Sequence, residues 1–249
     1  MKLYDETIKK MQALLEKADS RMPSAGRSLT LPTGDTGWPE VSDRSMILRH
    51  DMAYELGGEG LPAIGCTLIT ADESLVPADA LTLLGRDLPE IRRDVPYARI
   101  ALVRVSGDTL GEGQALYNAV RALEYTRYHF YPEGFMMRVS ASRQKETVRI
   151  GKDALARGLD FTKTGNRMIT AFHRNTSVEA VHMYYVTAEE FAYKELESLA
   201  DESERITKTI DHIFKNAVMD CGACGLQKVC DEVEGLRELH FAGRETKKR

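Results

Sequence analysis

The segment Ala98-Arg-Ile-Ala-Leu-Val-Arg-Val105 carries the strongest strand signal in the chain. Its isoleucine, leucine and valines form an almost continuous apolar run, which predicts a β-strand. Shorter apolar runs predict further strands at residues 64–70, 80–84 and 181–186, and a hairpin from residues 135–140 and 147–150. Strands and helices do not alternate strictly along the chain, so we expect an α+β fold rather than a doubly wound parallel sheet.

Helical spacing of apolar residues predicts four helices, at residues 4–18, about 113–130, 152–157 and 187 to about 216. Gly158 follows the third helix, where glycine commonly ends a helix. Thr187 and Glu190 have the spacing of a capping box at the start of the last. We expect a two-layer domain of mixed sheet and helices over residues 1–187, a long linking helix over 188–216, and a small metal-binding C-terminal segment with a basic tail over 217–249.

Composition and charge exclude several classes of protein. Of the 249 residues, 43% are hydrophobic and 29% are charged, which is usual for a soluble globular protein. The net charge of −4 disfavours a nucleic-acid binder, which would neutralise phosphates with basic residues. No stretch approaches about eighteen apolar residues, so we expect no membrane span. The N-terminus lacks the apolar region of a secretory signal, and we therefore expect a reducing, cytoplasmic setting.

Three of the four cysteines, Cys221, Cys224 and Cys230, fall within ten residues near the C-terminus, and His240 follows them. Written as a pattern, this is C-x2-C-x5-C-x9-H. Three thiolates with an imidazole suit zinc or an iron–sulfur cluster, and suit magnesium or calcium badly. A disulfide would leave one thiol over, while a redox pair and unliganded thiols are further interpretations. His240 is either the fourth ligand or a residue that packs or faces water.

Four segments of the chain, at residues 51–58, 84–91, 131–134 and 148–158, occur in the order of a known family. The first, DMAYELGG, resembles a D-M-x-x-E-M-G-G stretch, and the last, VRIGKDALARG, resembles L-R-V-S-K-D-A-V-A-K-G. The chain thus resembles the acetyl-CoA synthase family, the beta subunit of the CO dehydrogenase/acetyl-CoA synthase complex. The resemblance covers nearly the whole chain and corresponds to the middle domain and the start of the cluster-binding domain.

The resemblance implies a [4Fe-4S] cluster, which the family binds with a C-x2-C-x8-C-x9-C motif. In this chain the interval before Cys230 is three residues shorter, and His240 stands at the position of the fourth cysteine. The ligands implied are therefore Cys221, Cys224, Cys230 and His240. The family's nickel site needs a later Cys-Gly-Cys segment, which these 249 residues lack. We therefore expect no catalytic residues here and no acetyl-CoA formation by this chain alone.

The leading hypothesis is an acetyl-CoA-synthase-like iron–sulfur protein without the nickel centre. Its role would be accessory electron transfer or partner docking in one-carbon or corrinoid metabolism. We expect a corrinoid or redox protein as its partner and coenzyme A as a candidate ligand, and neither nucleic acid nor membrane. One alternative is a structural zinc module that binds a protein or a CoA-like ligand. Another is a component of a CO-methylating acetyl-CoA synthase completed by a separate nickel-bearing chain.

Two further features of the sequence have both a functional and a simpler structural interpretation. Cys66 lies in a predicted strand and reads as a small buried hydrophobe. An aromatic and basic region could bind the phosphates of coenzyme A, because arginine forks match phosphate groups. A solvated face of a helix and hairpin explains the same residues. They are Arg121, Tyr125, Arg127, Tyr128, His129, Tyr131, Arg138, Arg143 and Arg149.

Overall fold

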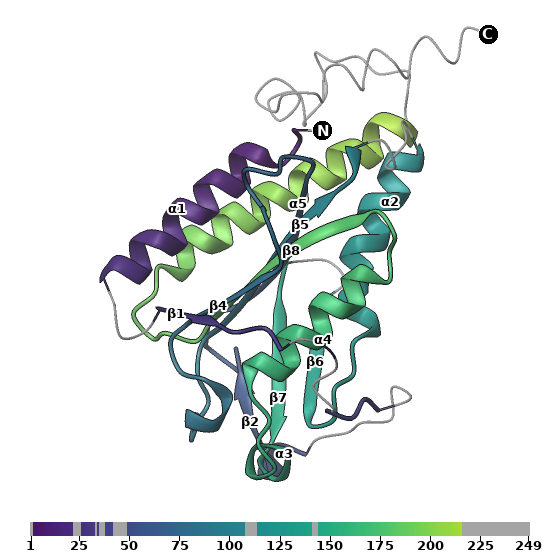
Figure 1. The fold of residues 1–249 in the computed structure, drawn as a ribbon. Helices are drawn as coiled ribbons and strands as arrows, with labels where there is room; N and C mark the ends of the chain where they lie inside the picture. The colour runs from purple at the N-terminus through teal and green to yellow at the C-terminus, as the bar shows by residue number, and fades with distance from the viewer. Residues whose placement is uncertain are drawn as a thin grey trace, which may run out of the picture.

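A mixed five-stranded sheet forms the centre of the computed structural model, which describes residues 2–21, 26–32, 34, 38–41, 49–107, 114–140 and 144–215 (Figure 1). The strand order is β1-β4-β8-β5-β3. β5 pairs with β3 in parallel and with β8 in antiparallel orientation. The bounds are β1 Gly26–Leu29, β3 Ala63–Thr70, β4 Ala80–Leu84, β5 Tyr97–Val105 and β8 Val178–Val186.

β5 confirms the strand predicted from its apolar run and begins one residue earlier than expected, at Tyr97. All of its residues except Arg104 are buried. A strand is apolar along its whole length when both faces of its sheet are covered. The burial of β5 therefore requires packing layers on both sides of the sheet.

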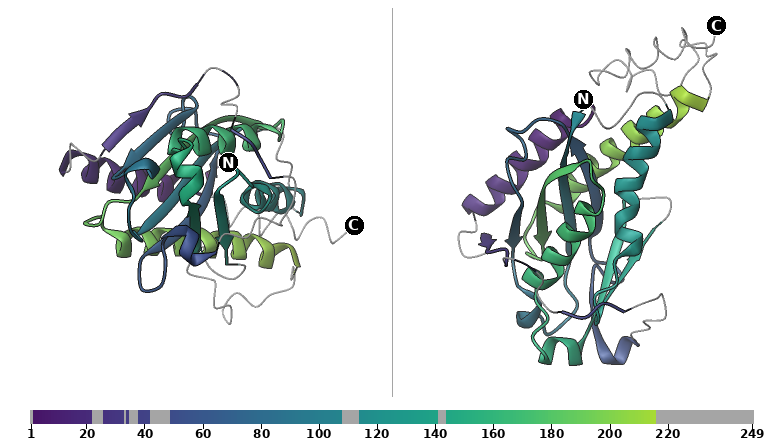
Figure 2. Two further views of the ribbon diagram at one scale, coloured as in Figure 1. Left: turned by 90° about the horizontal axis from the view of Figure 1, so that it is seen from below. Right: turned by 45° about the vertical axis from the view of Figure 1, so that its right-hand side comes forward.

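Two helices, α1 (Asp5–Arg21) and α5 (Tyr193–Lys215), lie side by side over one face of the sheet (Figures 1 and 2). Their buried faces repeat at helical spacing, as expected for amphipathic helices. Tyr4, just before α1, places its hydroxyl 2.8 Å from Oγ1 of Thr207 on α5. α2 (Gln114–Tyr125) packs against α5 and β3. No helix in the described ranges is long and apolar enough to cross a membrane.

The opposite face is covered by α4 (Phe161–His173), which packs on β8 and β4. Asp160 caps its N-terminus, since Oδ1 of Asp160 accepts a hydrogen bond of 2.7 Å from the backbone N–H of Lys163. Phe161 stacks on Tyr185 of β8, with ring centroids 4.3 Å apart. This helix therefore supplies much of the second packing layer.

A second, antiparallel sheet of three strands lies on the same side as α4, in the order β2-β7-β6. Its strands are β2 Ala53–Leu56, β7 Glu146–Gly151 and β6 Phe135–Val139. The small sheet is fixed to the large one by Arg99 of β5 and Glu146 of β7, both fully buried. The short helices are α3 Lys152–Ala156 and the 3₁₀ helices η1 His50–Met52, η2 Leu88–Glu90 and η4 Thr126–His129.

The predicted α+β class is confirmed, and so is the long helix near the C-terminus. The predicted start of that helix, at Thr187, was wrong, because α5 begins at Tyr193. Thr187 does not cap a helix: its Oγ1 donates a hydrogen bond to the carbonyl of Arg86 at 2.7 Å. The helix expected to reach residue 130 ends at Tyr125 and continues as η4. α4, β1 and β2 were not predicted.

Candidate functional site

The predicted metal ligands Cys221, Cys224, Cys230 and His240 lie outside the described residues, so their role stays a prediction. The helix that precedes them is described. The described part of α5 reaches Lys215, six positions before Cys221 in the sequence.

Cys66, the remaining cysteine, is fully buried in β3. Burial raises the pKa of its thiol to about 12, against the opposing influence of Arg99 and Arg127. A thiol of this kind stays protonated at neutral pH, whereas the thiolate is the form that binds metals. Cys66 is therefore a packing residue, as predicted, and not a metal ligand.

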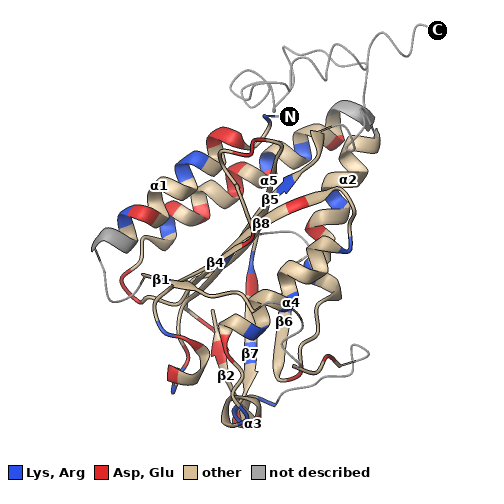
Figure 3. Ribbon diagram, in the orientation of Figure 1, with Lys and Arg blue, Asp and Glu red and all other residues tan. Residues whose placement is uncertain are grey.

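A polar groove of about 490 Å³ lies over the three-stranded sheet. β2 contributes Glu55, β6 contributes Arg138 and β7 contributes Arg149, while Lys145 and residues 57–59 line its edges. Figure 3 shows acidic and basic residues on β2 and β7. The groove thus carries both signs of charge on strands that a rigid core supports.

Strand register brings the groove's charges together. Glu55 lies directly opposite Arg149 in the β2–β7 pair, and Arg138 is the diagonal neighbour of Arg149 on β6. Nε of Arg149 donates a hydrogen bond of 2.6 Å to Oε1 of Glu55, and Nη2 of Arg138 donates to the same oxygen. Burial alone would raise the pKa of Glu55, but the two arginines outweigh it and hold that pKa below its usual value.

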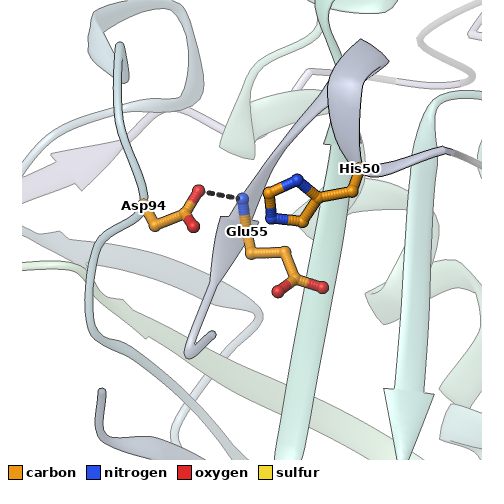
Figure 4. Close-up of side chains that lie close together, drawn as sticks. All are labelled: His50, Glu55 and Asp94. Carbon is orange, nitrogen blue, oxygen red and sulfur yellow. Dashed lines mark hydrogen bonds between the residues drawn. The ribbon is translucent and has the colours of Figure 1, made fainter. Parts of the chain in front are cut away.

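His50, Glu55 and Asp94 place one potential ligand atom each within 4.8 Å of one another (Figure 4). Oδ1 of Asp94 accepts a hydrogen bond of 2.8 Å from the backbone N–H of Glu55. The carboxylate of Glu55 is already bound by two guanidinium groups, which a cation would have to displace. This donor set therefore does not fit a resident metal.

The structure divides the predicted aromatic and basic region into two places. Arg138 and Arg149 lie in the groove, whereas Arg121 and Arg127 line a separate cavity beside α2. Arg143 lies outside the described residues. Tyr125 and Tyr128 pack against each other, with ring centroids 5.4 Å apart, on the side of the cavity beside α2. These residues therefore do not form one continuous phosphate-binding face.

Sequence reasoning missed Glu55 and Asp94 as members of a site. Glu55 lies inside the segment at residues 51–58 that carries the family resemblance, so a signal was present. Asp94 follows two arginines before a predicted strand, and nothing local indicates that it reaches β2. Chemically, the groove offers positioned guanidinium groups and the ammonium of Lys145, which has no ion-pair partner among the described residues. Such an arrangement suits an anionic ligand or an acidic partner surface.

A family model described as the CO dehydrogenase/acetyl-CoA synthase complex beta subunit matches residues 41–191. The match includes β2, β6 and β7, the three strands that build the groove, and most of the five-stranded sheet. No curated protein shows significant similarity to the chain.

Proposed function

Because the chain belongs to the family of the CO dehydrogenase/acetyl-CoA synthase complex beta subunit, we propose that it is an iron–sulfur protein that serves such a complex in one-carbon metabolism. Its α+β domain docks a partner, a corrinoid or redox protein, and its C-terminal segment holds a [4Fe-4S] cluster for electron transfer. The thiols that this needs are those of Cys221, Cys224 and Cys230, in the reducing setting of the cytoplasm.

The observation that carries the proposal is the packing of α5. Leu196, Ile206 and Ile210 are buried, so the helix is part of the core along most of its length. Its described part reaches Lys215, shortly before three soft ligands that suit a cluster. A rigid helix is a better support for a redox centre than a free loop, because a site built on rigid elements keeps its geometry.

The four cysteines of these 249 residues leave no thiolates for a dinickel centre beside the cluster. Nickel in such a centre needs thiolate ligands beyond those of the cluster. Cys66 is buried and protonated, and the other three cysteines belong to the C-x2-C-x5-C motif. We therefore propose that acetyl-CoA is formed only where another polypeptide supplies nickel, and that this chain supplies docking and electrons.

The groove over the small sheet is the proposed ligand surface of the domain. Arg138 and Arg149 are oriented by Glu55, and Lys145 adds a cation at the rim. Their chemistry suits the phosphates of coenzyme A or an acidic partner. Arg138 is the more accessible of the two arginines, since 43% of its side chain is exposed against 22% for Arg149.

Anaerobic purification followed by iron, sulfide and zinc analysis tests the cluster. We expect iron and sulfide in proportion to a single cluster, with visible absorbance that bleaches on reduction. The variant with Cys221, Cys224 and Cys230 all replaced by serine should lose both iron and sulfide, whereas Cys66→Ser should keep them. Stoichiometric zinc without sulfide would replace this proposal by the structural zinc module.

Titration of the full chain with coenzyme A, and separately with a methylated corrinoid protein, tests the groove. Arg138→Gln should weaken the relevant binding at least threefold. Lys10→Gln is the control, because Lys10 is an exposed cation on α1 that pairs with Glu202 and lies outside the groove. Equal binding by both variants would contradict a binding role for the groove. It would not bear on the proposed cluster, which is tested separately. Supplied with nickel, CO, coenzyme A and methylated corrinoid, the chain alone should form no acetyl-CoA.

A further inference from the structure

A second cavity, of about 210 Å³, lies between α2, η4 and the last turns of α5. It adjoins the groove over the small sheet at Ser140, which lines both, but its charged residues are different ones. α2 contributes Arg121 and Glu124, η4 contributes Arg127, and α5 contributes Thr207 and Lys208. α2 and the C-terminal half of α5 pack against each other, and α2 contacts η4 (Figure 1).

Arg127 is the unusual member of this cavity, because it is only 7% exposed. Its Nη1 donates hydrogen bonds to two neutral acceptors, the carbonyl of Gly65 at 2.8 Å and Oε1 of Gln144 at 3.2 Å. Its Nε–H has no acceptor among the described residues, and none of their carboxylates forms an ion pair with it. A buried charge without an opposite charge is costly, and proteins normally pair it.

Glu124 is near enough to act on Arg127 electrostatically, but no carboxylate of the described residues forms an ion pair with it. Glu124 is bound at one oxygen by Arg121 and at the other by Oγ1 of Thr207, which donates to it at 3.2 Å. Burial raises the pKa of Glu124 even though both arginines oppose the change. Lys208 is paired with Glu204 at 2.7 Å. Asp211 also lines the cavity, so the α5 wall carries both acidic and basic side chains. The buried guanidinium of Arg127 lies on the opposite wall, on η4.

We propose that this cavity binds a small oxyanion, a carboxylate or a phosphate, on the guanidinium of Arg127. An arginine fork matches the oxygens of either group. The volume is below that of usual pockets for cofactor-sized ligands, roughly 300–1,000 Å³, so a nucleotide or coenzyme A is too large. The proposal does not depend on the metal content of the C-terminal segment.

The position of the cavity gives the anion a structural consequence. One wall is η4 and the other is the part of α5 that contains Thr207 and Lys208. An anion bound between them contacts both walls and stabilises the last turns of α5 by linkage, because it binds the folded state alone. Binding of an anion in this cavity would therefore raise the stability of the part of α5 that precedes Cys221 in the sequence.

Isothermal titration of the full-length protein with phosphate, acetate and succinate, at constant ionic strength and with chloride as the reference, tests the site. We expect saturable binding of phosphate or of a carboxylate, and the tighter of the two identifies the source of the oxyanion. Arg127→Gln should weaken that binding at least tenfold. Arg157→Gln is the matched control, because Arg157 is an exposed arginine that pairs with Glu133 and lines neither hollow, and it should leave the binding unchanged.

Because Arg127 also supports Gly65, its variant can fail to fold, so a second variant is needed. Lys208 is an exposed residue at the mouth of the cavity, and Lys208→Glu should weaken the same binding at least threefold, whereas Lys10→Glu on α1 should not. The absence of saturable binding by the wild type would overturn the proposal. Equal binding by wild type, Lys208→Glu and a folded Arg127→Gln would overturn it as well.

Discussion

Arg99 and Glu146 join the two sheets through an ion pair from which solvent is completely excluded. Nε of Arg99 donates to Oε1 of Glu146 at 2.8 Å, and Nη2 donates to Oε2 at 2.8 Å. Nη1 of Arg99 also donates to the carbonyl of Cys66 at 3.3 Å. The groove over β2, β7 and β6 is therefore held on the central sheet by a charged contact within an apolar core.

The first prediction concerns this pair. Glu146→Gln should lower the free energy of unfolding by about 3–5 kcal/mol, because it leaves the buried guanidinium of Arg99 without its counter-charge. Chemical denaturation at neutral pH measures the loss. The control is Glu133→Gln, which breaks the exposed pair of Glu133 and Arg157 and should cost less than about 1 kcal/mol. Similar losses in the two variants would contradict the role given to Arg99 and Glu146.

A second prediction follows from the closeness of β3 to Glu146. A Cβ added at Gly65 would lie 2.4 Å from Oε2 of Glu146, so a methyl group cannot fit without moving the ion pair. Gly65→Ala should lower stability by about 1–3 kcal/mol, the usual cost of overpacking a core. At Gly107 the nearest atom to an added Cβ is 3.7 Å away, so Gly107→Ala should change the melting temperature little. A melting temperature unchanged by Gly65→Ala would show that Glu146 can move.

The pH dependence of stability provides a third prediction. The pKa of Glu55 is lowered in the folded protein, so its ion pairs with Arg138 and Arg149 add stability above the unfolded-state pKa. That stability is lost as the pH falls from about 5 through the lower folded-state pKa. Glu55→Gln should thus be less stable than wild type at pH 7, and the gap should narrow towards pH 3. Urea unfolding at several pH values measures the difference in free energy of unfolding between the two proteins. A difference that widens in acid would contradict the stabilising role given to the ion pairs of Glu55.

His240 is the subject of a fourth prediction. If it is a cluster ligand, as its position at the family's fourth cysteine implies, His240→Ala should lower iron and sulfide content or shift the reduction potential. His240→Cys should retain the cluster, because thiolate is the usual ligand. Elemental analysis and redox titration of anaerobic samples compare the three proteins. Identical spectra and potentials in all of them would show that the chain provides only three ligands.

The sequence predicted elements whose signal is local. The strand at β5 could be recognised because its apolar residues follow one another, and Gly158 does adopt the positive φ of +94° expected after a helix. α4 was missed because glycine, asparagine and threonine interrupt it, although Phe161, Met168 and Phe172 form a buried stripe at helical spacing. β1 has no strand pattern of its own and owes its conformation to pairing with β4.

The site was less predictable because its contacts join distant parts of the chain. Glu55 and Arg149 are 94 residues apart, and only the pairing of β2 with β7 makes them neighbours. Arg127 illustrates the same point. The sequence allows a solvated helix face for it, yet η4 turns the side chain inward towards Gly65. Local pattern gives the residue types of a site, while burial and partners depend on tertiary packing.

The contact between Tyr4 and Thr207 spans 203 positions of the chain, and this has a consequence for biosynthesis. At about 5–20 residues per second, α1 leaves the ribosome roughly 10–40 s before its partner on α5 exists. During that time the apolar face of α1, which includes Ile8 and Met11, cannot yet pack against α5 and is a target for chaperones. The meeting of α1 and α5 is thus a late event in synthesis, and the cysteine segment emerges directly after the helix that completes the core.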